Sequence, residues 1–189
     1  MRTPMTTDKG FSLIEVLVAL LLTTIGVLGM VALQGRSIQY TQDSVQRNTA
    51  VVLTGDLIEI MRAHPKELFD MAPPQFPMNS GLKNNSLFYK EAGDDLANRA
   101  TCVADPARIA KTAKEFRDCW ADRVEALLPG GEDLFKDHGY ICRSSSPGNC
   151  DSKGSMVEIR LAWHVREGAC LDAGDPNATV CTYTVRVEP

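Results

Sequence analysis

The sequence is poor in the residue patterns that usually carry enzyme chemistry. Its three histidines, His64, His138 and His164, are scattered, and its cysteines form no Cys-x-x-Cys pair. It also lacks a Gly-x-Ser-x-Gly elbow, a His-Glu-x-x-His pair and a glycine-rich phosphate loop. These absences argue against a zinc site and against common hydrolases and nucleotide-binding enzymes. We therefore expect no catalytic residue, no cofactor and no metal site, and we interpret the histidines as ordinary surface or turn residues.

Charge is almost absent from residues 11–33, where an apolar run contains a single carboxylate, Glu15. As a helix, this run would be about 35 Å long, against about 30 Å for the hydrocarbon core of a bilayer. An ionised side chain inside such a span costs about 2.5–3.5 kcal/mol, so Glu15 needs a partner or a function. The alternative is that Glu15 lies near the headgroup boundary and reaches the water there.

The segment before the apolar run is short and weakly basic, with Arg2 and Lys9 against Asp8. A secretory signal would have an apolar core of about 7–15 residues and then a small-residue cleavage site. Here the run is longer and no Ala-x-Ala follows it, so any cleavage belongs before the run. Basic residues before the span and none inside it favour a cytoplasmic N-terminus and an exported remainder.

Residues 10–15 read Gly-Phe-Ser-Leu-Ile-Glu and closely resemble the class III leader junction of type IV prepilins. The resemblance implies that prepilin peptidase cuts after Gly10, that Phe11 becomes the methylated N-terminus, and that Glu15 is used in filament assembly. In that arrangement the Glu15 carboxylate of an incoming subunit meets the Phe11 amine of a neighbour. Assembly would then neutralise a charge that the lone helix exposes to lipid.

Beyond residue 33 apolar residues become less frequent. They then recur on one helical face, at Leu53, Leu57, Ile60 and Met61. Because Pro65 disfavours helical geometry in the residue before it, we expect the helix to end near Ala63 or His64. Gly26 and Gly29 are weak points, suited either to close helix packing in lipid or to local melting in a filament. The predicted organisation is a cleaved leader at 1–10, a transmembrane and assembly helix at 11–33, its amphipathic continuation at 34–63, and one globular periplasmic or extracellular head at 64–189.

The six cysteines all lie in the predicted exported part, at Cys102, Cys119, Cys142, Cys150, Cys170 and Cys181. An even number in an oxidising compartment indicates disulfides, although fifteen pairings are possible. We favour pairing in sequence order. Cys142 and Cys150 would then close one loop, and Cys170 and Cys181 would close a hairpin.

The head pattern predicts an α+β fold, with the long N-terminal helix packed on a small antiparallel sheet. Residues 65–104 read as an irregular connector with a short helix near 94–100, and Asp105-Pro106 begins a second helix that reaches Pro129. We expect Phe116 and Trp120 of this helix to lie in the core. Alternating apolar residues predict strands at 157–165 and 181–187, and a third strand is expected at 140–142. This layout is the one that pilins share.

The stretches at 119–131, 157–163 and 183–189, added to the leader and the single disulfide-rich head, resemble the PilV family of type IV pilus minor pilins. The resemblance implies a scarce subunit that primes pilus assembly at the inner membrane and ends near the tip, where it supports adhesion and twitching motility. The implied partners are other minor pilins, the major pilin, prepilin peptidase, the inner-membrane assembly platform and a large PilY-type tip adhesin.

Three alternatives remain open. A minor pseudopilin of a type II secretion system would have the same leader and span. A DNA-uptake pilin is disfavoured by the net charge of −4, because nucleic-acid binding draws on Lys and Arg clusters. A membrane-anchored periplasmic enzyme finds no support, since Asp94 and Asp95 read as a helix start and residues 144–146 as a turn.

Overall fold

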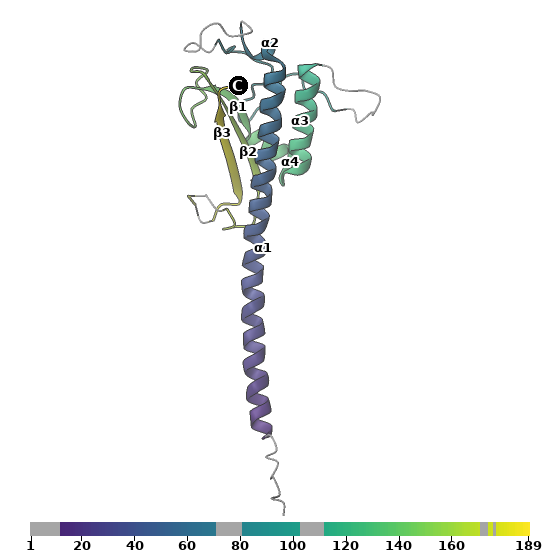
Figure 1. Ribbon diagram of the computed structural model, residues 1–189, viewed down its shortest axis with the longest axis vertical. Coiled ribbons are helices and arrows are strands. Elements are labelled where there is room, and N and C mark those ends of the chain that lie inside the picture. The colour runs from purple at the N-terminus through teal and green to yellow at the C-terminus, as the bar shows by residue number, and fades with distance from the viewer. Residues whose placement is uncertain (1–11, 71–80, 103–111, 171–173, 176) are drawn as a thin grey trace, which may run out of the picture. The chain divides into compact units, whose positions relative to one another are not determined.

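The computed structural model describes residues 12–70, 81–102, 112–170, 174–175 and 177–189. Figure 1 shows the elements in chain order: α1 (Leu13–Ala63), α2 (Pro65–Leu68), α3 (Ala113–Leu127), α4 (Gly131–Asp137), β1 (Tyr140–Ser144), β2 (Met156–His164) and β3 (Val180–Val187). The described chain falls into two compact units, which divide between Gln39 and Tyr40. The N-terminal part of α1 forms the first unit, and the end of α1 belongs to the second.

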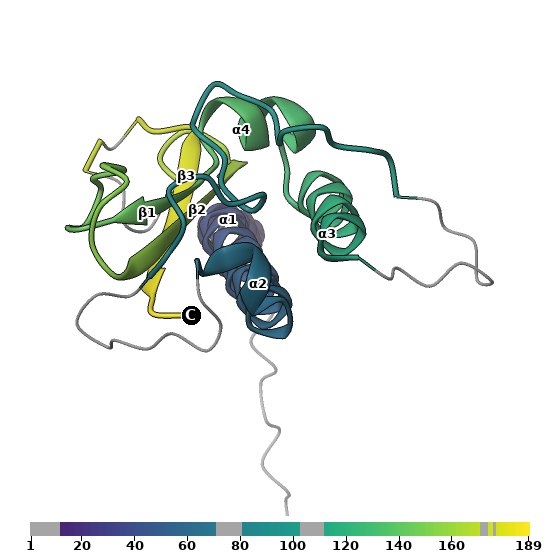
Figure 2. The same cartoon turned by 90° about the horizontal axis from the view of Figure 1, so that it is seen from above.

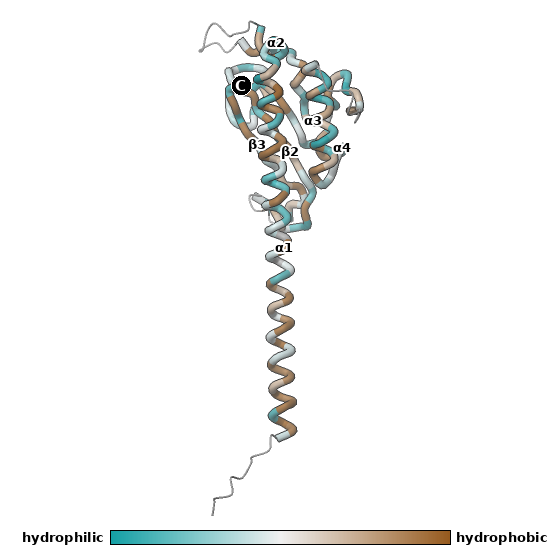
Figure 3. Tube along the Cα trace, turned by 45° about the vertical axis from the view of Figure 1, so that its right-hand side comes forward, coloured by the Kyte–Doolittle hydropathy of each residue, from teal (hydrophilic) through white to brown (hydrophobic). Residues whose placement is uncertain are grey.

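The first unit is an apolar helix whose side chains are exposed along its length. The main-chain carbonyl of Ser12 accepts hydrogen bonds from the amides of Glu15 and Val16, at 3.0 and 3.3 Å, and so begins α1. The hydroxyls of Thr23 and Thr24 donate to carbonyls three residues earlier, at 2.9 and 2.8 Å. An 18-residue window has a mean hydropathy of 2.6, and Figure 3 shows this apolar stretch in brown. The helix is therefore long and apolar enough to cross a membrane, with its hydroxyls satisfied internally.

The end of α1 is where the sequence predicts it. The helix stops at Ala63, and Pro65 begins the short helix α2. His64 between them has a non-helical backbone, and its ring Nδ1 lies 2.9 Å from the carbonyl oxygen of Ile60. The proline therefore acts as expected, by excluding the helical conformation from the residue before it.

In the second unit, α1 has the sheet on one side and α3 on the other (Figures 1 and 2). The sheet is antiparallel with the strand order β1-β2-β3, and β2 pairs with β3 from Val157 to His164. Alternate residues of β2 are buried in the core: Val157, Ile159, Leu161 and Trp163. The α+β, pilin-like fold class is confirmed, including the three predicted strands.

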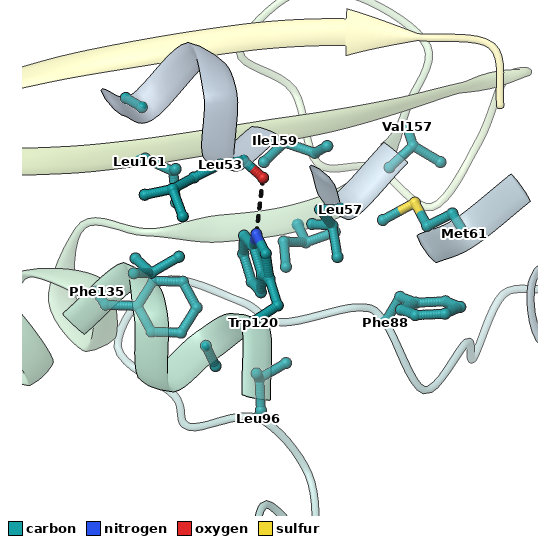
Figure 4. Packing of buried hydrophobic residues seen from close by; sticks show 14 of the residues in the cluster. Leu53, Leu57, Met61, Phe88, Leu96, Trp120, Phe135, Val157, Ile159 and Leu161 are labelled. Atoms are coloured by element: carbon teal, nitrogen blue, oxygen red, sulfur yellow. Dashed lines mark hydrogen bonds between the residues drawn. The ribbon is translucent and has the colours of Figure 1, made fainter. Parts of the chain in front are cut away.

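Two tryptophans join the layers of the core. The Trp120 side chain of α3 is 1% exposed, and its Nε1 donates to the carbonyl of Leu53 in α1 at 2.7 Å (Figure 4). Its ring meets that of Phe135 edge-on, with centroids 5.7 Å apart. Trp163 of β2 donates from Nε1 to the carboxylate of buried Asp43, at 3.0 Å. Each indole thus buries a large apolar area, and its N–H donates to a residue of α1. The acceptor is a main-chain carbonyl for Trp120 and a side-chain carboxylate for Trp163.

The buried face of α3 differs from the predicted one. Phe116 was expected in the core but is 36% exposed, with its ring 5.5 Å from that of His64. Arg117, which is 1% exposed, lies inside instead and donates to the carbonyls of Leu87 and Ala97, at 2.6 and 3.0 Å. The stripe otherwise keeps Ala113, Trp120 and Val124 buried as expected, and Arg117 supplies donors to two main-chain carbonyls.

The connector before α3 is held by carboxylates of that helix. The amide of Ala100 donates to Asp118 at 2.9 Å, and the amide of Cys102 donates to Asp122 at 2.6 Å. Burial would raise the pKa of Asp118, but hydrogen bonds from Lys114, Ala100 and Arg117 outweigh burial and lower it. These bonds explain why residues 94–100 form turns and not the predicted short helix. The Asp105-Pro106 helix start lies outside the described residues, and α3 is capped by Thr112 with a capping box to Glu115.

Three disulfides join the cysteines in sequence order, as the sequence analysis favoured. They link Cys102 to Cys119, Cys142 to Cys150, and Cys170 to Cys181. The first ties the connector to α3, the second closes the loop after β1, and the third joins the start of β3 to the loop after β2. Each closes a loop of modest length, for which about 2–4 kcal/mol of stabilisation is typical.

The face of β2 turned away from the core buries a carboxylate, Glu158. Its oxygens accept from the hydroxyls of Tyr140 and Ser144, at 2.6 and 3.0 Å, and from the Gly148 amide at 2.9 Å. Nε of Arg186 lies 3.3 Å from it. Burial would raise the pKa of Glu158, but these partners outweigh burial and lower it. Glu158 therefore fastens the disulfide-closed loop and β3 to the centre of the sheet.

We expect the Glu158→Gln variant to lose about 1–3 kcal/mol of stability at pH 7, since charge-assisted hydrogen bonds become neutral ones. The pKa of Glu158 is lower in the folded chain, so its stabilisation is present above the ordinary value of 4.5 and lost as the pH falls through the lowered folded value. Urea unfolding at pH 7 and pH 4 measures how much the free energy of unfolding falls on acidification. This decrease should be smaller in the variant than in the wild type. Glu188→Gln, at an exposed position, is the control. If the free energy of unfolding fell equally on acidification in the Glu158 variant and in the wild type, the stabilising role of ionised Glu158 would be contradicted.

Candidate assembly site

Glu15 lies in the first turn of α1. A carboxylate at this position interacts favourably with the positive end of the helix dipole, so Glu15 helps to start the helix whatever else it does. Within the described part of the chain, no hydrogen bond or salt bridge reaches its carboxylate. Glu15 thus lies in an apolar segment without a partner for its carboxylate among the described residues, and a charge in such a segment is stabilised by pairing.

The helix surface beside Glu15 is open and includes two small side chains, Ala19 and Thr23. Glu15, Ala19 and Thr23 follow one another at four-residue intervals, and with Val16 and Leu20 they line one open depression. The Thr23 hydroxyl is already bonded to the Leu20 carbonyl. Small residues on one face let a second helix approach closely, so a neighbouring helix can reach the Glu15 carboxylate.

The other predicted assembly residues, Gly10 and Phe11, lie outside the described residues. The sequence therefore remains the only basis for assigning the cleavage position and the methylated amine. Glu15 is the one residue of the predicted site that the structure describes.

Asp95 and Ser144, two polar residues of the head, have structural partners. Asp95 pairs with Lys136 at 2.9 Å, and Ser144 donates to the buried Glu158. Within the described ranges, no cluster of three or more His, Cys, Asp or Glu residues is placed to hold a metal. Sequence reasoning missed the buried charges of Arg117, Asp118 and Glu158, for which residue spacing gives no signal.

Comparison with known proteins gives one match. The family model described as the prokaryotic N-terminal methylation motif matches residues 5–31, which include Gly10, Phe11 and Glu15. No curated protein and no solved structure is similar enough to count as a match. The match therefore covers residues 5–31, and the rest of the described chain is characterised by its own structure.

The motif and the fold together support a type IV pilin-like protein, either a pilin or a pseudopilin. The family match points to a structural protein of the pilin type. Prepilin-type proteins generally interact with other pilins and with prepilin peptidase. The leader and the long apolar helix fit a single-pass anchor in the inner membrane.

Proposed function

We propose that this chain is a minor pilin of a type IV pilus, of the PilV type. It joins other minor pilins in a complex that primes assembly on the inner-membrane platform. It then lies near the tip above the major pilin, where it supports a PilY-type adhesin, adhesion and twitching motility. The observation that carries the proposal is the methylation motif over residues 5–31, together with an apolar helix whose Glu15 carboxylate has no hydrogen bond or salt bridge to any described residue.

The chemistry of assembly follows from two charges. Prepilin peptidase removes residues 1–10, and the new N-terminus at Phe11 is methylated but remains a cationic amine. Glu15 of an incoming subunit approaches this amine on a neighbour, and the open depression beside Glu15 gives the neighbouring helix access. Two opposite charges in a low-dielectric medium attract strongly once both have lost their water. Assembly is therefore favoured over a lone helix in lipid.

The head is proposed to face the periplasm before assembly and the cell exterior afterwards, with the N-terminus of the precursor in the cytoplasm. Three disulfides fit an oxidising compartment. The leader contributes a charge of +1 to the total of −4, so its removal leaves the mature chain at −5. That acidic balance does not favour nucleic acid as a partner.

A minor pseudopilin of a type II secretion system is the second candidate, because the methylation motif and apolar helix fit it equally well. Deletion of the gene separates the two. We expect the deletion strain to lose surface pili and twitching while exoprotein secretion continues, and we expect peptides of this chain in sheared, purified pili. Loss of secretion with normal twitching would favour the pseudopilin and contradict the proposal.

A further inference from the structure

The two edges of the sheet differ in how their backbone groups are satisfied. At the β1 edge, Lys90 and Ile141 exchange two backbone hydrogen bonds, each 2.9 Å long. The amide of Ser152 donates to the carbonyl of Arg143 at 3.2 Å on the same side. Lys90 is fixed there because its buried Nζ donates to the carbonyls of Lys136 and Gly139, at 2.9 and 2.8 Å. The chain itself therefore covers the β1 edge.

The β3 edge has no such cover among the described residues. The amide of Val165 donates to the carbonyl of Thr179, which extends the β2–β3 pairing. This bond fixes which residues of β3 turn their backbone groups toward β2 and which turn them away. In an antiparallel ladder, every second residue turns its N–H and C=O groups away from the partner strand. The register therefore directs the backbone groups of Thr182, Thr184 and Arg186 outward. No hydrogen bond from the described part of the chain reaches them.

The usual protections of a free edge are also missing from β3. The strand pairs with β2 in regular register from Val180 to Val187 without a bulge, and it contains neither proline nor lysine. Its single charge, Arg186, is directed to Glu158 and to the carbonyl of Ser144. Natural proteins commonly block exposed edges with these features, so a long, regular and open edge indicates a place for another strand.

The two faces of β3 define the chemistry of that strand. On the core side, Tyr183, Val185 and Val187 are only half-buried, so an added strand would continue the apolar layer. On the other side Thr184 is exposed, and its hydroxyl accepts from Nε of Arg160 at 3.3 Å. Arg160 stacks on the Tyr140 ring and forms no salt bridge with any residue that the structure describes. The outer face therefore favours acidic side chains in the partner.

We propose that the β3 edge binds an extended segment of a different protein, in which apolar and acidic residues alternate. A second copy of this chain fits less well. Its β3 would place Thr182, Thr184 and Arg186 on the outer face, where Arg160 favours acidic side chains. Main-chain hydrogen bonds supply the affinity, and the alternate side chains supply the specificity. The inference stands on the sheet and does not depend on the leader or on the class of filament.

The test uses the full-length chain in detergent and a short synthetic peptide that alternates Glu and Val. Residue-resolved amide exchange should be fast at Thr182, Thr184 and Arg186 in the free chain and slow when the peptide is bound. A peptide with every amide N-methylated should not bind, and a peptide with Lys in place of Glu should bind about tenfold more weakly.

Thr184→Pro is the sharpest variant, because it removes an outward N–H and leaves the pairing with β2 in place. We expect it to weaken peptide binding by about tenfold or more, while the matched variant Thr184→Val binds as the wild type does. Slow exchange of the three amides in the free chain would overturn the proposal, since another part of the chain or a second copy would then cover the edge. Binding of the N-methylated peptide, or equal binding of the Lys peptide, would also overturn it, and these two results do not depend on how the proline variant folds.

Discussion

Glu15→Ala is expected to insert into the membrane as the wild type does and to be depleted at least about tenfold from purified pili. Insertion depends on the apolar run, which the change makes more apolar. Incorporation depends on the carboxylate meeting the amine of a neighbouring subunit, and removing one partner leaves the other charge in lipid without compensation. Quantitative immunoblots of membranes and of sheared pili, each normalised to the major pilin, measure the two steps separately.

Glu59→Ala is the matched control for this experiment. Glu59 lies on the same helix but in the second unit, where its exposed side chain pairs with Arg62 at 3.0 Å. Exposed pairs contribute little, so its incorporation should be unchanged. If Glu15→Ala entered pili as efficiently as Glu59→Ala, the charge-pairing account of assembly would be wrong.

Trp120→Ala should destabilise the head by about 3–5 kcal/mol, the usual cost of deleting a large buried aromatic side chain. The change removes the ring that packs between α1 and Phe135, and with it the hydrogen bond to the Leu53 carbonyl. Urea unfolding of the full-length chain in detergent, followed by circular dichroism and by the fluorescence of the remaining Trp163, measures the loss.

Phe116→Ala provides the comparison on the same helix. Because Phe116 is 36% exposed and contacts His64 at the surface of the unit, the loss there should be about 1 kcal/mol. Equal losses at the two positions would show that the buried face of α3 is not the one described.

The parts of the fold that the sequence predicts are those governed by local chemistry. The end of α1 follows from Pro65, which restricts the residue before it wherever it occurs. The strands follow from alternation, since the period of two places Val157, Ile159 and Leu161 on one face in any sheet. The pairing of cysteines in sequence order agrees with the three disulfides of the structure.

Buried polar residues could not be predicted because their partners come from distant parts of the chain. Arg117 donates to the carbonyls of Leu87 and Ala97, which lie 30 and 20 residues away, in addition to its neighbour Asp118. Residues 94–100 are likewise held in turns by distant partners, since Asp118 accepts from the Ala100 amide and Arg117 donates to the Ala97 carbonyl. Glu158 occupies an ordinary outward position in its strand, and only the folded loop above it makes that position buried.

The candidate assembly site, by contrast, is identified from the sequence more than from the structure. Glu15 is conspicuous in the sequence because a charge in an apolar run carries a known cost, and the leader motif predicts the roles of Gly10 and Phe11 without any structure. The open β3 edge is invisible in the sequence, since it depends on strand order and on which edge Lys90 covers. Motif and hydropathy therefore predict the anchor, and topology is needed to find a docking edge on the head.

The most direct measurement of the central claim is the mass of the first peptide of this chain, isolated from cells that carry pili. The account predicts a chain that begins with N-methylated Phe11, in membranes and in sheared pili alike. A chain that keeps Met1 and residues 2–10 in both fractions would contradict it, because Glu15 would then have no freed amine to meet.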